Sequence, residues 1–260
     1  MMNLELLIDL HKDGARQGPG DEKLTKLAID IAGLGESDTS LKILDVGSGT
    51  GASTLVLAKY LDAEIMAVDL SSELLQVLEE ATLSKGFSDK ITTLKCSMDN
   101  LPFPTNSFDV IWGEGSIYIM GFKKGVGYFN RYLKPGGILA VSEITWLTSS
   151  RPDELTSYWQ KEYSEIAIAS KKIKILEDHG FTMKGYFPLP KSAWLDNYYL
   201  PLQDRFATFL ASHKSKAANQ VINCEQREIE MYNKYCSYYS YGFYIAQKGF
   251  RDTERSMAGG

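Results

Sequence analysis

The chain has 260 residues, of which 44% are hydrophobic and 23% are charged. It is therefore long enough for one α/β domain with additions, and apolar enough to bury a core. Its formal net charge of −5 argues against a nucleic-acid partner, because neutralising phosphates requires clustered lysine and arginine. The nearest approach to a basic run, Lys171, Lys172 and Lys174, has the spacing of a solvated helix face.

The three cysteines, Cys96, Cys224 and Cys236, show no CxxC spacing. An odd count without that spacing argues against a disulfide framework and favours a reducing compartment. Residues 1–10 lack the basic start and the long apolar run of a signal peptide. No window approaches the roughly 20 apolar residues of a membrane span. We therefore expect a cytoplasmic protein with no membrane and no nucleic-acid partner, and the sequence leaves a homodimer open.

Short apolar runs alternate with helical patterns through the first 150 residues. Strands that alternate with helices imply βαβ units and a parallel, doubly wound sheet. Ligands of such sheets bind at the carboxyl ends of the strands. The pattern predicts strands at residues 41–46, 64–69, 91–96, 108–112 and 137–144, and helices at residues 22–34, 53–61, 71–85 and 123–132.

The pattern after residue 145 is less regular. It predicts a helix at residues 173–179, a strand at residues 181–187 and a last strand at residues 239–247. A long aromatic and helical segment before the last strand is interpreted as a cap insertion. The predicted organisation is a lid at residues 1–21, a core at 22–187, the cap at 188–238, the last core strand at 239–250, and a tail at 251–260.

Residues 45–51, with the sequence DVGSGTG, place three glycines between a predicted strand and a predicted helix. Glycine permits tight backbone turns and close approach of a ligand, and the helix that follows presents free amide groups. The turn alone is ambiguous. Gly47-x-Gly49-x-x-Ala52 satisfies a dinucleotide-binding fingerprint, whereas Gly47-x-Gly49-x-Gly51 satisfies a methyltransferase pattern.

Asp69 ends the second predicted strand. An acidic side chain at this point can accept hydrogen bonds from both ribose hydroxyls of a bound nucleoside. The two kinds of site share this feature, so Asp69 does not separate them. Its alternative role is a cap for the helix that begins near Ser71.

Three downstream motifs separate the alternatives: LPF at residues 101–103, FD at residues 108–109 and LKPGG at residues 133–137. Together with DVGSGTG, they resemble the class I S-adenosylmethionine-dependent methyltransferases. The resemblance is strongest to the branch related to the ubiquinone and menaquinone biosynthesis methyltransferases, and it covers roughly residues 40–147. It implies S-adenosylmethionine as the cofactor. It also implies a Rossmann-like methyltransferase fold with a seven-stranded, mostly parallel sheet.

The resemblance also implies cofactor contacts. Asp69 would hold the ribose, and Leu70 would lie near the adenine. The family usually has Asp-Ala after the third strand; this chain departs with Ser97 and Met98, and Asp99 follows one or two positions late. Residues 113–116 would line the cleft near the methyl group. The residues expected to hold the methionine portion are Asp45, Gly47, Ser48, Gly49 and Gly51.

Residues 11–20, with the sequence HKDGARQGPG, are too rich in glycine for a helix. Similar small-molecule methyltransferases place such a segment over the cofactor as a lid. Arg16 would then pair with the methionine carboxylate, a task that suits a guanidinium. The alternative is a disordered leader with an exposed arginine.

Methyl transfer from a sulfonium is an in-line displacement, so the protein mainly aligns the reactants and excludes water. A general base is needed only if the nucleophile arrives protonated. Candidate bases are Glu114, Tyr118 and Glu143, with His11 on the lid. Each has a structural alternative, since Glu114 and Glu143 can contact the cofactor or cap helices, and Tyr118 can belong to the core. No metal site is predicted.

The acceptor pocket is expected from residues 117–122, 145–163 and 188–238, which are rich in tyrosine and tryptophan. Such side chains can enclose an apolar or cationic small molecule, or can form the core of the cap. Three other functions stay open. These are a nicotinamide-dependent oxidoreductase, a cofactor-binding protein without turnover, and a thiol-dependent methyltransferase of the arsenic type that uses the three cysteines.

Overall fold

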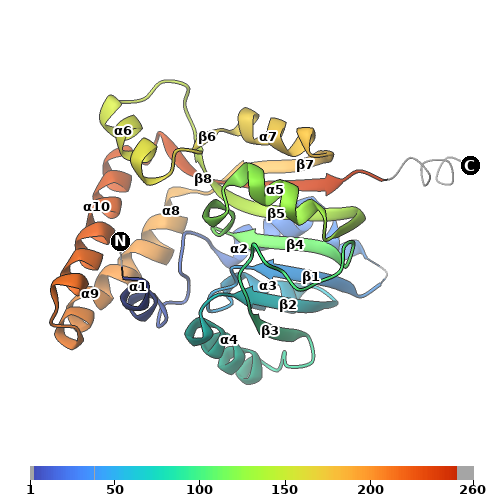
Figure 1. Cartoon of the computed structure of the whole chain (residues 1–260), viewed down its shortest axis with the longest axis horizontal. Helices are drawn as coiled ribbons and strands as arrows, with labels where there is room; N and C mark the ends of the chain where they lie inside the picture. Colours follow the sequence, from blue (N-terminus) through green and yellow to red (C-terminus); the bar gives the residue numbers. More distant parts are fainter. Residues whose placement is uncertain (1–2, 38, 251–260) are drawn as a thin grey trace, which may run out of the picture.

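The computed structural model describes residues 3–37 and 39–250, so the predicted tail at residues 251–260 lies outside the described residues. Figure 1 shows an open sheet with helices on both faces and a further group of helices beyond one end of the strands. That end carries the functional site described below.

The central sheet has the strand order β3-β2-β1-β4-β5-β8-β7, with the short β6 (Ala167–Ile168) paired to β5 outside this path. Strands β1 to β5 are mutually parallel, whereas β8 is antiparallel to both of its neighbours. This confirms the predicted doubly wound, mostly parallel sheet. The strand bounds are β1 (Leu41–Val46), β2 (Ala63–Asp69), β3 (Ile91–Lys95), β4 (Phe108–Glu114), β5 (Leu133–Trp146), β7 (Phe181–Pro188) and β8 (Tyr239–Lys248).

Helices cover both faces of the sheet, because the central strands are apolar on both faces. In β1, Ile43 packs into one core cluster while its neighbour Leu44 packs into another. Such continuous burial is typical of parallel strands. One face carries α2 (Glu22–Ala32), α3 (Ala52–Tyr60) and α4 (Ser72–Lys85), and the other carries α5 (Phe122–Asn130) and α7 (Ala169–Asp178).

The segment between β7 and β8 forms a helical cap beyond the carboxyl ends of the parallel strands (Figure 1). It consists of α8 (Lys191–Trp194), the π-helical turn η3 (Leu195–Tyr199), α9 (Leu200–Ser212) and α10 (Lys216–Tyr235). Aromatic rings fill its interior. The Trp194 ring stacks on that of Tyr232 with centroids 4.4 Å apart.

Two helices and the full length of one strand were not predicted. Helix α1 (Leu4–His11) packs against α9 and α10, and therefore joins the cap layer. Helix α6 (Asp153–Glu162) buries only Leu155 completely, so its apolar period is too sparse to detect. Strand β5 begins four residues earlier than the predicted residue 137, because the LKPGG motif is already extended.

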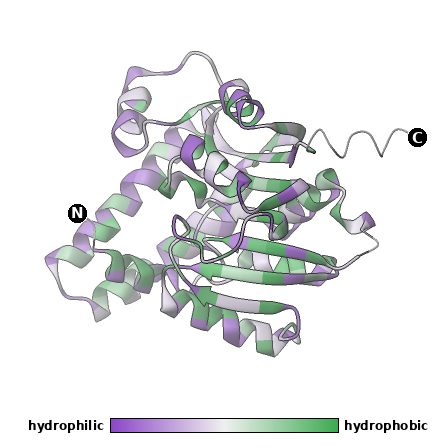
Figure 2. Cartoon of the chain, turned by 45° about the vertical axis from the view of Figure 1, so that its right-hand side comes forward, coloured by the Kyte–Doolittle hydropathy of each residue, from purple (hydrophilic) through white to green (hydrophobic). Residues whose placement is uncertain are grey.

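Figure 2 shows that the strands carry mostly hydrophobic residues, whereas the helices of the cap alternate between hydrophobic and hydrophilic ones. This is the pattern expected for a sheet buried on both faces beside amphipathic surface helices. None of the helices in the described part of the chain is long and apolar enough to cross a membrane.

Candidate functional site

The glycine turn between β1 and α3 requires glycine at three positions. Gly47, Gly49 and Gly51 have φ angles of +68°, +54° and +88°, in the left-handed region where a side chain is disfavoured. There is also no space for a side chain at these positions. A Cβ on Gly47 would lie 2.5 Å from the Cβ of Ser116, and a Cβ on Gly51 would lie 2.2 Å from Cδ1 of Leu78. The turn is therefore closely packed on both sides.

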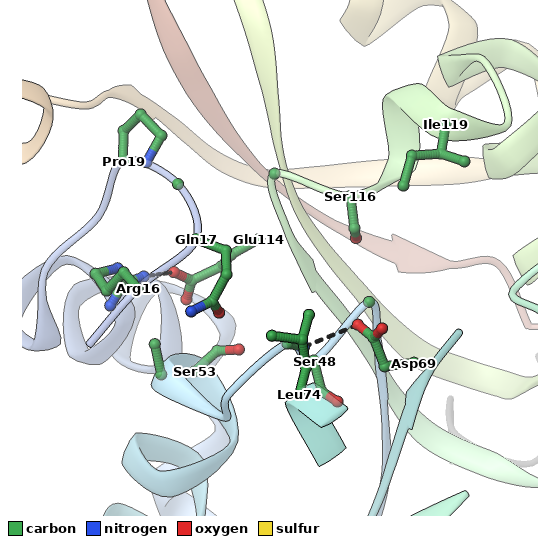
Figure 3. Close-up of a pocket in the computed structure, with 15 residues that line it drawn as sticks. Arg16, Gln17, Pro19, Ser48, Ser53, Asp69, Leu74, Glu114, Ser116 and Ile119 are labelled. Atoms are coloured by element: carbon green, nitrogen blue, oxygen red, sulfur yellow. Dashed lines mark hydrogen bonds and ion pairs between the residues drawn. The ribbon is translucent and has the colours of Figure 1, made fainter. Parts of the chain in front are cut away.

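A cleft of about 130 Å³ opens above this turn (Figure 3). Four parts of the chain supply its walls: the N-terminal segment, the glycine turn with the start of α3, the region from the end of β2 into α4, and the region after β4. The lining residues are Arg16, Gln17, Gly18, Pro19, Gly47, Ser48, Gly49, Ala52, Ser53, Asp69, Leu74, Glu114, Gly115, Ser116 and Ile119.

Asp69 lies at the end of β2 and faces the glycine turn. Its Oδ2 accepts a hydrogen bond from the Gly49 N–H at 3.0 Å, and its Oδ1 accepts one from the Ser71 N–H at 2.9 Å. The carboxylate thus restrains the start of α4 and lines the cleft at the same time. The two roles considered for Asp69 are compatible, since each oxygen keeps a further lone pair.

Asp45 does not line the cleft. It is fully buried, and its Oδ2 accepts hydrogen bonds from Ser53 Oγ at 2.9 Å and Thr54 Oγ1 at 2.7 Å. Burial, opposed by these two bonds, raises the pKa of Asp45 to about 7. The side chain therefore fixes the first turn of α3 against β1, and its contact with a ligand would be indirect.

Arg16 reaches across the cleft to Glu114, with which it forms a buried ion pair (Figure 3). Glu114 also accepts hydrogen bonds from Thr25 Oγ1 at 2.7 Å and Trp112 Nε1 at 3.0 Å. Three donors on one carboxylate leave Glu114 poorly suited to act as a general base. Its position instead holds the Arg16 guanidinium at the cleft wall.

Gln17 was missed by the sequence reasoning, although it fastens the N-terminal segment to the glycine turn. Its Oε1 accepts a hydrogen bond from the Thr50 N–H at 3.0 Å, and its Nε2 donates to the carbonyl oxygens of His11 and Gly14, each at 3.2 Å. One side chain therefore connects both ends of residues 11–17 to the turn. No periodic pattern in the sequence predicts these hydrogen bonds of Gln17.

The remaining predicted cofactor residues lie at different depths. Ser48 lines the cleft, and its buried Oγ has no hydrogen-bond partner. Leu70 is 59% exposed next to Asp69. Ser97 donates to Asp99 Oδ1 at 2.6 Å, and the Met98 methyl group lies 3.3 Å from the Cβ position of Gly47.

Glu143 lies in β5 and pairs with Lys172 at 2.9 Å, with both side chains almost fully buried. The expectation that Lys171, Lys172 and Lys174 form a solvated helix face is therefore wrong at Lys172. Lys172 lies on the buried face of α7, where the Glu143 carboxylate neutralises its charge. Burial raises the pKa of Glu143 and lowers that of Lys172. A carboxylate enclosed in this way has no open path to a ligand in the cleft.

Tyr118 lies in the short turn η2 (Ile117–Ile119) and is 45% exposed. Burial against neighbouring protein, with the charges of nearby glutamates, raises its pKa. The phenol is consequently protonated at neutral pH, which does not suit a general base. His11, the fourth candidate base, is buried in the cap layer, with its Nε2 3.5 Å from Glu225 Oε1.

The three cysteines are free thiols that do not line the cleft. Cys224 lies within α10 and Cys236 caps its end, so the rise of a helix puts them about 18 Å apart. Cys96 packs in a different core cluster from Cys236. These placements contradict the thiol-dependent alternative, which requires the three sulfurs to converge.

Comparison with known proteins gives a consistent result. Residues 43–137 match the methyltransferase domain family. A sterol 24-C-methyltransferase of Pneumocystis carinii is 32% identical over 124 residues, which cover 47% of this chain and 32% of that protein. A ubiquinone/menaquinone biosynthesis C-methyltransferase UbiE of Teredinibacter turnerae is 29% identical over 123 residues, covering 46% of this chain and 48% of that protein. The chain thus spans about half or less of the length of these curated relatives.

Solved structures resemble the chain over almost its whole length. A methyltransferase of Geobacter sulfurreducens in complex with S-adenosylhomocysteine has a TM-score of 0.80 and 16% identity, covering 94% of this chain and 98% of that one. A [4+2]-cyclase, SpnF, has a TM-score of 0.75 and 21% identity, covering 95% and 93%. At these identities the likeness shows the fold alone, and the cyclase illustrates that one fold hosts different chemistries.

The matched domain, the relatives and the shared fold confirm the resemblance seen in the sequence. Residues 43–137 therefore form a methyltransferase domain, and the chain is similar to the class I S-adenosylmethionine-dependent methyltransferases.

Proposed function

We propose that the chain transfers a methyl group from S-adenosylmethionine to a small-molecule acceptor by direct in-line displacement. The observation that carries this proposal is the convergence of the glycine turn, Asp69 and Arg16 on one cleft, beneath an N-terminal segment fastened by Gln17. A narrow, covered cleft suits a small acceptor better than a macromolecule. The cytoplasm is the proposed compartment, in keeping with the spacing of the cysteines.

The cleft fits the cofactor in charge and in shape. Arg16 would receive the methionine carboxylate, Asp69 would receive the ribose hydroxyls, and the glycine turn lines the same cleft. The unpartnered Ser48 Oγ offers a further polar contact in the same wall. Leu70, Ser97 and Met98 are the candidates for the adenine end.

When bound, S-adenosylmethionine supplies a methyl group that is already activated on a sulfonium. The chain's own residues then have to orient the two reactants and to keep water out. Glu114 holds Arg16 in place, and Asp45 holds the start of α3 behind the turn. Neither Glu114 nor Glu143 is placed to abstract a proton from an acceptor, so we assign no base to either.

The proposal is tested by calorimetric titration of the full chain with S-adenosylhomocysteine and, separately, with NAD. We expect micromolar binding of the homocysteine derivative and at least 100-fold weaker binding of NAD. Tighter binding of NAD would favour the oxidoreductase, for which Gly47, Gly49 and Ala52 satisfy the fingerprint. Conversion of labelled cofactor in the presence of an acceptor panel distinguishes an enzyme from a cofactor-binding protein without turnover.

A further inference from the structure

Residues from three distant parts of the chain converge between the cap and the cleft. They are Tyr118 in η2, Tyr198 in η3, Tyr241 in β8, and Glu225 and Glu228 in α10. The His11 ring stacks on Tyr198, and its Nε2 lies 3.5 Å from Glu225 Oε1. Tyr199, whose ring centroid lies 5.0 Å from that of Tyr198, donates a hydrogen bond to Glu228 at 2.8 Å. The Trp194 ring contacts the rings of both Tyr199 and Tyr241. The charge of Glu228 also raises the pKa of Tyr118. We call these five residues the tyrosine recess.

The tyrosine recess adjoins the cofactor cleft. The ring of Tyr241 comes within 2.9 Å of the Cβ position of Gly115, and Gly115 lines the cleft. Tyr118 precedes Ile119, another lining residue, in the same short turn. A molecule in the recess would therefore lie next to the residues that follow β4, where the resemblance places the methyl group.

Water reaches this region. The side chain of Tyr118 is 45% exposed, and the neighbouring Ile119 lines the cofactor cleft. Glu228 is half-buried in the same way, and burial together with Glu225 raises its pKa to about 7.

The recess contains two carboxylates, one beside a histidine and the other beside a tyrosine hydroxyl. Glu225 is only 7% exposed, and its Oε2 is buried without a hydrogen-bond partner, while its Oε1 lies 3.5 Å from His11 Nε2. Glu228 accepts a hydrogen bond from the Tyr199 hydroxyl at 2.8 Å. Within residues 3–37 and 39–250, no lysine or arginine forms an ion pair with either glutamate.

A buried carboxylate oxygen without a donor, such as Glu225 Oε2, is costly, and a ligand that donates a hydrogen bond would complete it. The buried Nδ1 of His11, whose ring stacks on Tyr198 at 6.0 Å, is likewise without a partner. Carboxylates beside tyrosine side chains suit a cation, because an ammonium group can donate to the oxygens and is attracted to aromatic rings.

On the basis of the proposed function, we propose that the methyl acceptor is a small amine whose nitrogen is bound in the tyrosine recess by Glu225 and Glu228. An ammonium group has no free lone pair, so a proton must leave before attack. The Glu228 carboxylate accepts that proton. The nitrogen lone pair then forms a bond to the methyl carbon while the carbon–sulfur bond breaks, and that electron pair stays on sulfur.

The binding test uses the full chain with saturating S-adenosylhomocysteine and two probes of similar size, tetramethylammonium and tert-butanol. We expect titration by saturation-transfer NMR to show at least tenfold tighter binding of the cation. Glu225→Gln and Glu228→Gln should each weaken binding of tetramethylammonium at least tenfold. Glu230→Gln, at an exposed position of the same helix, is the matched control and should leave it unchanged. Equal binding of both probes, or unchanged binding by both glutamine variants, would overturn the proposal.

The turnover test measures transfer of the labelled methyl group to small primary, secondary and tertiary amines and to their hydroxyl counterparts. We expect labelled product from amines alone, and loss of at least 90% of the rate in Glu228→Gln with unchanged affinity for S-adenosylhomocysteine. Labelling of hydroxyl compounds alone would overturn the inference but leave the methyltransferase proposal standing. Failure to bind S-adenosylhomocysteine at all would instead contradict the proposed function. Thermal melts of each glutamine variant confirm that it is folded.

Discussion

Replacing Asp69 with alanine is the most direct test of the cofactor site. The structure gives this carboxylate two backbone donors, the Gly49 N–H at 3.0 Å and the Ser71 N–H at 2.9 Å, and leaves lone pairs toward the cleft. A hydrogen bond to a charged group contributes about 1.5–3 kcal/mol. Loss of one ribose contact therefore predicts a decrease in affinity of roughly 10- to 150-fold, since each 1.4 kcal/mol is about a factor of ten.

The two ribose contacts are not additive, because the same carboxylate makes both. We accordingly expect about 100-fold weaker binding of S-adenosylhomocysteine to Asp69→Ala. Loss of the two backbone partners also predicts a folded state that is less stable by about 1–3 kcal/mol. Asp69→Asn, which keeps an acceptor oxygen but loses the charge, should fall between the wild type and the alanine variant in affinity.

Isothermal titration calorimetry at a temperature well below the melting transition measures this change. Glu64→Ala is the matched control, because Glu64 is an exposed acidic residue on the same strand, β2. It should bind S-adenosylhomocysteine as the wild type does. An affinity of Asp69→Ala within twofold of the wild type would refute the assignment of Asp69 to the cofactor site.

Three further predictions concern Arg16, Asp45 and Glu143. Arg16→Ala should weaken S-adenosylhomocysteine at least tenfold in calorimetry but leave adenosine, which lacks the methionine portion, within twofold; equal losses would exclude a contact with the carboxylate. Because the pKa of Asp45 is raised to about 7 from an ordinary 3.8, its ionisation opposes folding increasingly between pH 4 and 7. The free energy of unfolding, relative to that of Asp45→Asn, should therefore fall over this range and be constant above it; a difference independent of pH would contradict the burial argument. Glu143→Gln should leave Lys172 unpaired and lower the free energy of unfolding by about 3–5 kcal/mol in urea titrations, with recovery when Lys172→Met is added; a single variant as stable as the wild type would contradict this.

The central part of the fold was predictable because its signals are local. Each strand from β1 to β4 is a short apolar run, and the turn at residues 47–51 requires glycines whose φ angles are positive. The position of Asp69 was predictable for the same reason, since it is the last residue of a strand that the pattern gives. The resemblance supplied the class of cofactor, which the glycine turn alone left ambiguous.

The cap layer was only partly predictable. Residues 188–238 were predicted to form a cap with aromatic and helical character. Their aromatic composition fits a packed core and a binding site equally well. Helix α1 was not predicted, although its His11 lies against Glu225 of the tyrosine recess. Lys172 was misplaced because a run of lysines gives no sign of which one turns toward a buried carboxylate.

By itself, the sequence determined the doubly wound sheet, the position of the glycine turn and the acidic residue that follows the second strand. These depend on backbone conformation and on the alternation of apolar residues over a few positions. Only the tertiary structure decided that Gln17 fastens the N-terminal segment, that Glu114 holds Arg16, and that Glu228 accepts a hydrogen bond from Tyr199. Those contacts join side chains from distant parts of the chain, and their partners are selected by packing in three dimensions, which leaves no periodic trace in the sequence.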